Sequence, residues 1–284
     1  MTGKDLEAIV ADIKELPTLP QVAVTLMDLL DDPNTGAPQI NRVMARDPAL
    51  ASKILKLVNS AYYGLSNRVS SLNQAIVILG FKTVKSIALS ASVMGLFKTH
   101  AEKGTFDRSL FWKHSIASAC VARLVARKQK GADPEAAFSA GLLHDIGKLV
   151  LDQYLPVDME SIVGIAQKDK SDFISAERKV LETTHAEIGR WVAEKWGLPK
   201  ELVGAIGYHH EIDTAPDKVL VAVVQFANFL SKLKGLAASG SYETPELAKE
   251  VWTQLAVDKS DLPELVNTIN EEISAASSWI EVTG

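Results

Sequence analysis

The sequence predicts an all-α fold, a multi-helix bundle, and two features of the chain support this class. Apolar residues recur at i, i+3, i+4 and i+7 in residues 21–30, 49–60, 115–128 and 217–233, the spacing of a helix with one buried face. Between such segments lie DPNTGAP, RDP, GADP, GLP and TAPD, where Pro, Gly and Asp end one helix and start the next. Because regularly spaced strand-like alternation is absent from the sequence, we expect no sheet.

Three parts of the chain are expected. Residues 1–98 are expected to form an N-terminal lobe of short helices joined by Asp-Pro turns. Residues 106–237 are expected to form a second helical lobe, which contains five of the six histidines. The polar segment KTHAEKGTF between them suits a loop. Residues 245–284 predict two more amphipathic helices that pack on the domain.

One expected helix of the N-terminal half, which follows Asp47, has recognisable ends. Asp47 is placed to cap a helix that has Pro48 at its first position, and Asn59 and Ser60 are placed to close it. Two tyrosines follow, at positions 62 and 63, and we expect them to pack between the halves rather than to form a partner-binding patch.

Composition excludes several classes of protein. With 284 residues, of which 47% are hydrophobic, the chain can bury a large core. A net charge of -5 argues against nucleic-acid binding, so the cations at positions 42, 46, 53 and 56 predict an ordinary solvated face. The N-terminus lacks the basic start of a signal peptide, and no apolar stretch approaches the roughly 20 residues that span a bilayer. We therefore expect a cytoplasmic protein.

One cysteine, Cys120, lies in the apolar run SIASACVARLVA. A single cysteine cannot form a disulfide within the chain. We expect Cys120 to be a small buried residue rather than a nucleophile.

The histidines indicate a candidate metal site. His144 and Asp145 lie in the apolar run AGLLHDIGKLVL, where a carboxylate is costly to bury without a partner or a metal. Adjacent residues on one helix project about 100° apart, so both side chains can reach one ion only from the polar edge of that helix. His114 is expected on an earlier helix and His185 on a later one.

His209 and His210 are expected to close a further helix. Four helices would then each offer imidazole, and bundles build metal sites from facing helices in this way. Imidazoles with one carboxylate suit divalent transition metals such as Fe, Mn, Zn or Ni. The alternative for each histidine is an ordinary hydrogen-bonded residue, and His100, in the polar connecting segment, receives no role.

The order H…HD…H…HH, with HDIGK after an apolar run, resembles the HD superfamily of metal-dependent phosphohydrolases. The stretch from His185 to Pro199 resembles its HD-GYP and HDOD branches. The segments LPTLPQVAVTLMDLLDDPNT, RDPALASKILKLVNSAYYG and SSLNQAIVILGFKTVKSIAL are similar to the opening of HDOD domains, and the resemblance covers residues 12–235. It implies an all-α domain of bacterial signal-transduction and regulatory proteins, a non-catalytic relative of the HD hydrolases.

The resemblance to the HD-GYP branch also implies roles for single residues. Metal would be bound by His114, His144 and Asp145, and a second site would be completed by His185, His209 and His210. Lys148 would contact phosphate. Glu177 lies near the place where that branch has a carboxylate ligand, but a solvent-facing helix position is the commoner interpretation of such a residue.

Two departures from the HD-GYP pattern argue against catalysis. The sequence EIDTAPDKV after His210 lacks the Asp-Gly-x-Gly-Tyr-Pro signature, so we do not expect hydrolysis of cyclic dinucleotides. The last metal-binding Asp of HD hydrolases falls on Asn228, which offers a neutral oxygen but neither balances the charge of a metal nor acts as a base.

The first functional hypothesis is therefore an HDOD-type regulatory module that binds a protein partner and keeps a structural remnant of the HD site. The alternative is a metal-dependent phosphohydrolase of a nucleotide or other phosphoester, in which Lys148 would be catalytic. A weaker alternative is a small-ligand sensor that uses the histidine cluster. Neither nucleic acid nor membrane is expected as a partner, and homo-oligomerisation stays open.

Overall fold

The computed structural model describes residues 6–13, 16–97, 106–235, 246–255, 257, 262–276 and 279. Every regular element within these residues is a helix, and none of them forms a β-strand, which confirms the all-α prediction. Among the helices described, none combines the length and the apolar character that crossing a membrane requires.

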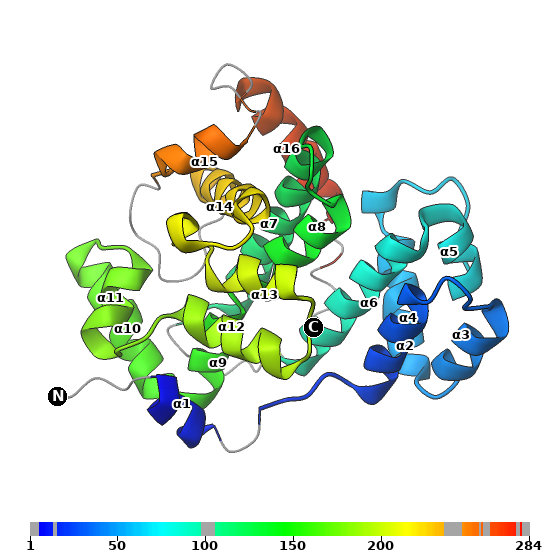
Figure 1. The fold of residues 1–284 in the computed structure, drawn as a ribbon, viewed down its shortest axis with the longest axis horizontal. Coiled ribbons are helices and arrows are strands. Elements are labelled where there is room, and N and C mark those ends of the chain that lie inside the picture. The colour runs from blue at the N-terminus through cyan, green and yellow to red at the C-terminus, as the bar shows by residue number, and fades with distance from the viewer. Residues whose placement is uncertain are drawn as a thin grey trace. The chain divides into compact units, whose positions relative to one another are not determined.

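The chain divides into two compact units (Figure 1). The larger unit comprises Met1–Leu16 and His100–Asn270, and the smaller unit comprises Pro17–Thr99 and Glu271–Gly284. Each unit is therefore made of two separate stretches of sequence, and the two ends of the chain belong to different units.

The smaller unit is built around a long helix that is buried over most of its length. Its helices are α2 (Gln21–Asp31), α3 (Ala37–Met44), α4 (Pro48–Val58), η1 (Ala61–Tyr63), α5 (Leu72–Leu79) and α6 (Phe81–Leu96). Both α2 and α4 pack on α6. The side chain of Asp47 accepts a hydrogen bond from the backbone N–H of Leu50, and Asn59 follows the last residue of α4. The predicted start and end of this helix are thus confirmed.

An aromatic cluster joins distant parts of the smaller unit. The rings of Tyr62 and Tyr63 meet edge to face with centroids 5.1 Å apart, and Tyr62 meets Trp279 in the same way at 6.1 Å. The indole Nε1 of Trp279 donates a hydrogen bond to Ser60 Oγ at 3.2 Å. These tyrosines therefore anchor a residue near the C-terminus, while their predicted packing between the halves of the chain stays a prediction.

The larger unit surrounds α7 (Arg108–Lys128), which packs on α8 (Pro134–Leu143) and on α14 (Lys218–Leu233). Cys120 lies on α7 and is 1% exposed, so its predicted burial is confirmed. The remaining helices of this unit are α1 (Leu6–Asp12), α9 (Ile146–Tyr154), α10 (Pro156–Asp169), α11 (Phe173–Val180), α12 (His185–Lys195), α13 (Lys200–Gly207), η2 (Ile212–Thr214) and α15 (Lys249–Gln254). The last helix, α16 (Leu262–Ala276), begins in the larger unit and ends in the smaller one.

The four segments with helical periodicity coincide with α2, α4, α7 and α14, so those predicted helices are confirmed. Helices α15 and α16 occupy the C-terminal region, and α15 packs on α14. His100 lies outside the described residues.

Candidate metal centre

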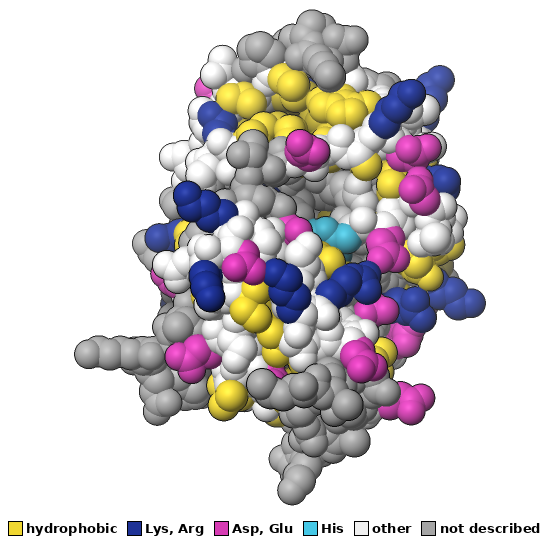
Figure 2. All heavy atoms as spheres, turned by 90° about the vertical axis from the view of Figure 1, so that its left-hand side faces the viewer, with side chains coloured by type: hydrophobic (Ala, Val, Ile, Leu, Met, Phe, Trp, Pro, Cys, Tyr) yellow, Lys and Arg dark blue, Asp and Glu magenta, His cyan; other side chains and the backbone are white. Residues whose placement is uncertain are grey.

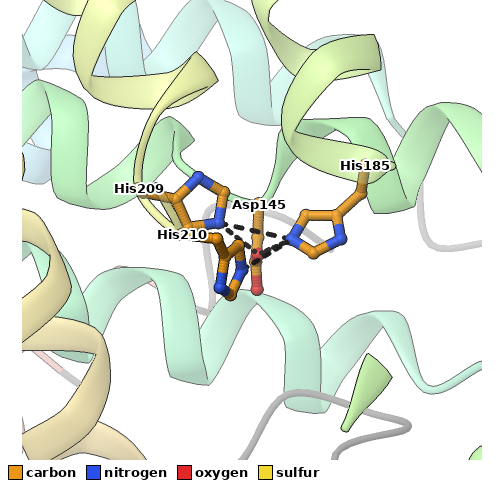
Figure 3. Close-up of side chains that lie close together, drawn as sticks. All are labelled: Asp145, His185, His209 and His210. Atoms are coloured by element: carbon orange, nitrogen blue, oxygen red, sulfur yellow. Dashed lines mark hydrogen bonds and ion pairs between the residues drawn. The ribbon is translucent and has the colours of Figure 1, made fainter. Parts of the chain in front are cut away.

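The structure brings all six predicted ligands together in the larger unit. His114 lies within α7, His144 directly after α8 and His185 at the start of α12. His209 and His210 follow the end of α13. Their ligand atoms form two groups that share Asp145. One group contains His114 and His144, and the other, drawn in Figure 3, contains His185, His209 and His210.

The expectation that His144 and Asp145 share one helix is wrong. Helix α8 ends at Leu143, α9 begins at Ile146, and the two residues form the break between them. A break allows both side chains to turn toward the same point without the angular separation that a continuous helix imposes. Five of the six ligands therefore lie at or just beyond the ends of helices, and His114 lies on the face of α7.

The carboxylate of Asp145 is the centre of the cluster, and its two oxygens face different partners. Oδ1 lies 3.0 Å from His185 Nε2 and 3.5 Å from His209 Nε2. Oδ2 lies 2.7 Å from Lys148 Nζ, with His144 Nε2 at 3.5 Å and His114 Nε2 at 3.7 Å. One carboxylate can therefore serve two adjacent cation positions.

Backbone carbonyls fix the orientation of two imidazoles. His144 Nδ1 lies 2.8 Å from the carbonyl oxygen of Gly141, and His209 Nδ1 lies 2.7 Å from that of Ile206. Because a carbonyl only accepts, each Nδ1 carries the proton, and in the neutral ring Nε2 keeps a lone pair. Those lone pairs point into the cluster.

Glu177 fixes the third imidazole, that of His185. This glutamate is completely buried, which makes the solvent-facing alternative wrong. Its Oε2 lies 2.8 Å from His185 Nδ1, and its Oε1 accepts the backbone N–H of His185 at 3.0 Å. A carboxylate that holds the far nitrogen of a metal-binding histidine fixes its tautomer and its orientation. Glu177 thus positions a ligand and is absent from both groups of candidate ligands.

Lys148 is a buried cation at this centre, only 2% exposed. Its ammonium group donates to Asp145 Oδ2 and lies 4.9 Å from the centre of the Phe173 ring. Contact with a carboxylate and an aromatic face stabilises a charge that burial alone would disfavour.

Burial and this charge set the protonation of the cluster. Burial alone would raise the pKa of Asp145, but Lys148 and the neighbouring imidazoles hold it well below its usual value. Burial lowers the pKa of His144 well below its usual value and also lowers that of His209. Burial opposes protonation of His185, but Glu177 and Asp145 outweigh it, so the pKa of His185 is raised.

Two glycines let the helices approach closely enough to form the cluster. A Cβ on Gly147 would lie 2.0 Å from the carbonyl oxygen of His185, and a Cβ on Gly141 would lie 2.8 Å from that of Ser118. Gly147 therefore permits the contact between α9 and α12, and Gly141 permits the contact between α7 and α8. Sequence reasoning missed both residues, although Gly147 stands inside the quoted HDIGK motif.

The donor set fits a divalent metal ion. In the neutral tautomers, His185 Nε2 and His209 Nε2 face each other at 3.3 Å and both face Asp145 Oδ1, while His210 Nε2 lies 3.2 Å from His185 Nε2. Such a convergence of lone pairs is repulsive unless a cation or an extra proton lies between them. Imidazole nitrogens with one carboxylate oxygen are the donors that divalent transition metals prefer.

A small cavity of about 160 Å³ adjoins this donor set. It is lined by His209, His210, Asn228, Lys232 and Glu246, among others. Asn228 is 7% exposed, and its Oδ1 has no hydrogen-bond partner within the described residues. Figure 2 shows histidine atoms in a hollow with basic and acidic side chains around it. Asn228, the position that matches the last metal-binding Asp of HD hydrolases, thus lines the same cavity as His209 and His210.

The sequence of the chain is similar to those of several known proteins. An uncharacterized protein of Treponema pallidum (strain Nichols) is 29% identical over 237 residues, covering 78% of this chain and 44% of that protein. Ribonuclease Y of Desulfotalea psychrophila is 38% identical over 119 residues, covering 42% of this chain and 17% of that enzyme. The chain thus spans less than half the length of these curated relatives.

The whole fold also has a counterpart among solved structures. The crystal structure of an HDOD domain protein with unknown function from Geobacter sulfurreducens matches with a TM-score of 0.81 and 26% identity, over 96% of both chains. The family model of the HDOD domain matches residues 16–212. Because this match covers more than half of the chain, the protein belongs to the HDOD domain family.

Proposed function

We propose that this chain is an HDOD regulatory module that acts through a protein partner, and that its HD centre holds a divalent metal as a structural element. Family membership supports the regulatory role, since the family resemblance is to modules of bacterial signal transduction. Asp145, His185, His209 and His210 would hold the metal, because their ligand atoms lie within 4.8 Å of one another.

The observation that carries the non-catalytic reading is the burial of the reactive groups. Asp145 is 1% and Lys148 2% exposed, and of the five described histidines only His210 reaches the surface. The adjoining cavity of about 160 Å³ is smaller than the roughly 300 Å³ at which ligand pockets usually begin. His209 and His210 line this cavity, whereas neither Asp145 nor Lys148 is among its described lining residues. A phosphoester in the cavity would therefore not contact either of these two groups.

Asn228 supports the same conclusion. When bound, a divalent metal supplies Lewis acidity and lowers the pKa of a coordinated water. Hydrolysis at such a centre also needs protein groups that take up protons and balance charge. Asn228 borders the donor set with a neutral oxygen, so this position can do neither.

An activity assay tests the proposal. The purified chain, expressed with added Mn or Fe, would be incubated with bis-p-nitrophenyl phosphate, nucleotides, a cyclic dinucleotide and short RNA. The expected result is metal bound to the protein without turnover. Turnover that is lost in Asp145→Ala, and kept in the control Asp28→Ala, would overturn the proposal. Asp28 is an exposed acid on α2 of the smaller unit.

A metal-dependent phosphohydrolase is the second candidate, and Lys148 favours it. A buried ammonium group on the metal-binding carboxylate is placed to attract a phosphate oxygen. The similarity to ribonuclease Y adds RNA to the substrates worth testing, although it covers only 17% of that enzyme. Absence of any bound metal after supplementation would remove this candidate, and it would also remove the structural role of the metal proposed above.

A further inference from the structure

A groove of about 1,200 Å³ lies in the smaller unit. Its lining residues precede all the histidines of the cluster in the sequence. The end of α3, one face of α4 and the loop between η1 and α5 line it. The lining residues Pro48, Ser52 and Leu55 of α4 and Asn59, directly after its end, follow the spacing i, i+4, i+7 and i+11, so they share one face. At a rise of 1.5 Å per residue, that face is about 16 Å long.

Asn59 holds the opposite wall of the groove in place. Its amide donates to the carbonyls of Leu55 and Val69, each at 2.8 Å, and its Oδ1 accepts the N–H of Val69 at 2.7 Å. Val69 itself is buried. The loop is thereby pinned to α4, so the groove exists before any ligand binds. A preformed site lowers the ordering cost of binding.

The charge of the groove is opposite to that of the whole chain. Lys56 and Arg68 line it and are exposed, whereas no acidic residue stands among the described lining residues. The nearby carboxylate of Asp47 already accepts the N–H of Leu50. Within the described residues, neither of these two cations forms an ion pair. The whole chain, in contrast, carries a net charge of -5.

Apolar side chains line the groove together with these cations. Leu55 and Leu65 are half-buried, and Met44 and Ala51 line the same groove. A volume of about 1,200 Å³ exceeds the roughly 300–1,000 Å³ of small-molecule sites. Single-stranded nucleic acid is a poorer match, because it binds through stacking aromatic residues and many cations, and no aromatic residue lines the groove among the residues described.

We infer that this groove is the docking site for an acidic, partly apolar peptide segment of a protein partner. The inference rests on the proposed function, since it names the surface through which the partner would bind. Apolar side chains of the segment would cover Leu55 and Leu65, and its carboxylates would meet Lys56 and Arg68. A helical segment of about three turns matches the length of the α4 face.

A peptide selection tests the inference. The full chain would be the bait for a phage-displayed library of random peptides of about 12 residues, a length set by the groove. The expected peptides combine Asp or Glu with large apolar residues. Their affinity, measured by fluorescence anisotropy, should fall about tenfold or more in Lys56→Glu and in Arg68→Glu, and it should weaken as salt is raised.

Controls separate docking from folding. Lys128→Glu reverses an exposed cation on α7 of the larger unit and should leave peptide affinity unchanged. The urea midpoints of the three charge-reversal variants should stay close to that of the parent chain, since Lys56, Arg68 and Lys128 are all exposed. Leu55→Ala is the third groove variant, and it tests the apolar contact without changing the charge of the groove.

Three outcomes would overturn the inference: no selected peptide, peptides without acidic residues, or binding that groove variants leave unchanged. Tighter groove-dependent binding of a single-stranded RNA of the same length would also overturn it in favour of nucleic acid. Failure of the proposed function is seen separately, as Asp145-dependent turnover in the hydrolysis assay. An absence of both turnover and groove-dependent peptides would reject only the docking site.

Discussion

Replacing Glu177 by Gln should loosen His185 without changing the size of the buried side chain. Each carboxylate oxygen of Glu177 has its own contact on His185, the backbone N–H at 3.0 Å and ring Nδ1 at 2.8 Å. Gln keeps one acceptor oxygen and puts an amide group, which only donates, in place of the other. One buried donor of His185 is then left facing a donor.

The magnitude follows from that single lost bond. A hydrogen bond to a charged group contributes about 1.5–3 kcal/mol, and an unpaired buried donor costs a similar amount. Glu177→Gln should therefore lower the free energy of unfolding by about 2–3 kcal/mol. Because His185 loses its fixed tautomer, metal affinity should also fall by about 10–100-fold.

Urea unfolding followed by circular dichroism measures the first effect, and competition with a chelating dye measures the second. The matched control is Glu182→Gln, an exposed glutamate two residues before the cap of α12, where a change within about 0.5 kcal/mol is expected. If both variants unfold at the same urea concentration, the two-bond geometry of Glu177 is wrong. If only metal affinity stays unchanged, Glu177 does not position His185 for a metal.

Two further predictions concern the larger unit. Gly147→Ala places a methyl group 2.0 Å from the carbonyl oxygen of His185, so it should lower the free energy of unfolding in urea by about 1–3 kcal/mol or more. The control is Gly164→Ala, whose methyl group meets nothing within 4 Å. This variant should raise the free energy of unfolding by about 0.5–1 kcal/mol. For Glu135, burial outweighs the Arg123 guanidinium and raises the carboxyl pKa above 4.5. The folded state therefore binds this proton more tightly than the unfolded state. As pH falls through the raised pKa toward 4.5, the parent chain should become more stable relative to Glu135→Gln. Melting temperatures that show the opposite pH trend would contradict this sign.

Sequence periodicity predicts helices such as α2 and α4 well because each of them buries one face. The start of α4 could be predicted in detail, since the Asp47 cap and Pro48 act within a few residues of one another. Ends that depend on tertiary contacts were harder, as the break between His144 and Asp145 demonstrates. The sequence around this break has the pattern of a continuous helix, because apolar residues flank the polar pair on both sides. The break itself depends on contacts that the pair makes with other helices.

The chemistry of the site could be predicted by residue type, but its supporting contacts could not. The histidines stand out because imidazole is rare in apolar runs. Glu177 is marked in the sequence only by its place in the HD-GYP pattern, as a doubtful ligand. Its contact with His185 becomes visible only when α12 is placed against α11. The role of Gly147 is likewise invisible in the sequence, because it is defined by the distance to a backbone on another helix.

The buried charges of the centre indicate which of its two positions takes a metal. Asp145 and Glu177 are negative and Lys148 is positive, and imidazoles that bind metal are neutral. Lys148 already lies on Asp145 Oδ2, the oxygen nearer to His114 and His144, whereas Oδ1 faces His185 and His209 and, within the described residues, no Lys or Arg. We therefore expect about one ion per chain, on the Oδ1 side, because a second divalent charge beside the buried ammonium is costly.

Removing that ammonium should open the other position. Lys148→Gln keeps a side chain of similar length but takes one positive charge away from Asp145 Oδ2, so metal analysis should find up to about two ions per chain in this variant. His114→Ala added to Lys148→Gln should bring the value back to about one, since it removes a ligand from the position beside Oδ2. Two ions bound by the parent chain would show that Lys148 yields to a metal, and the assignment of the single ion to the Oδ1 side would then be wrong.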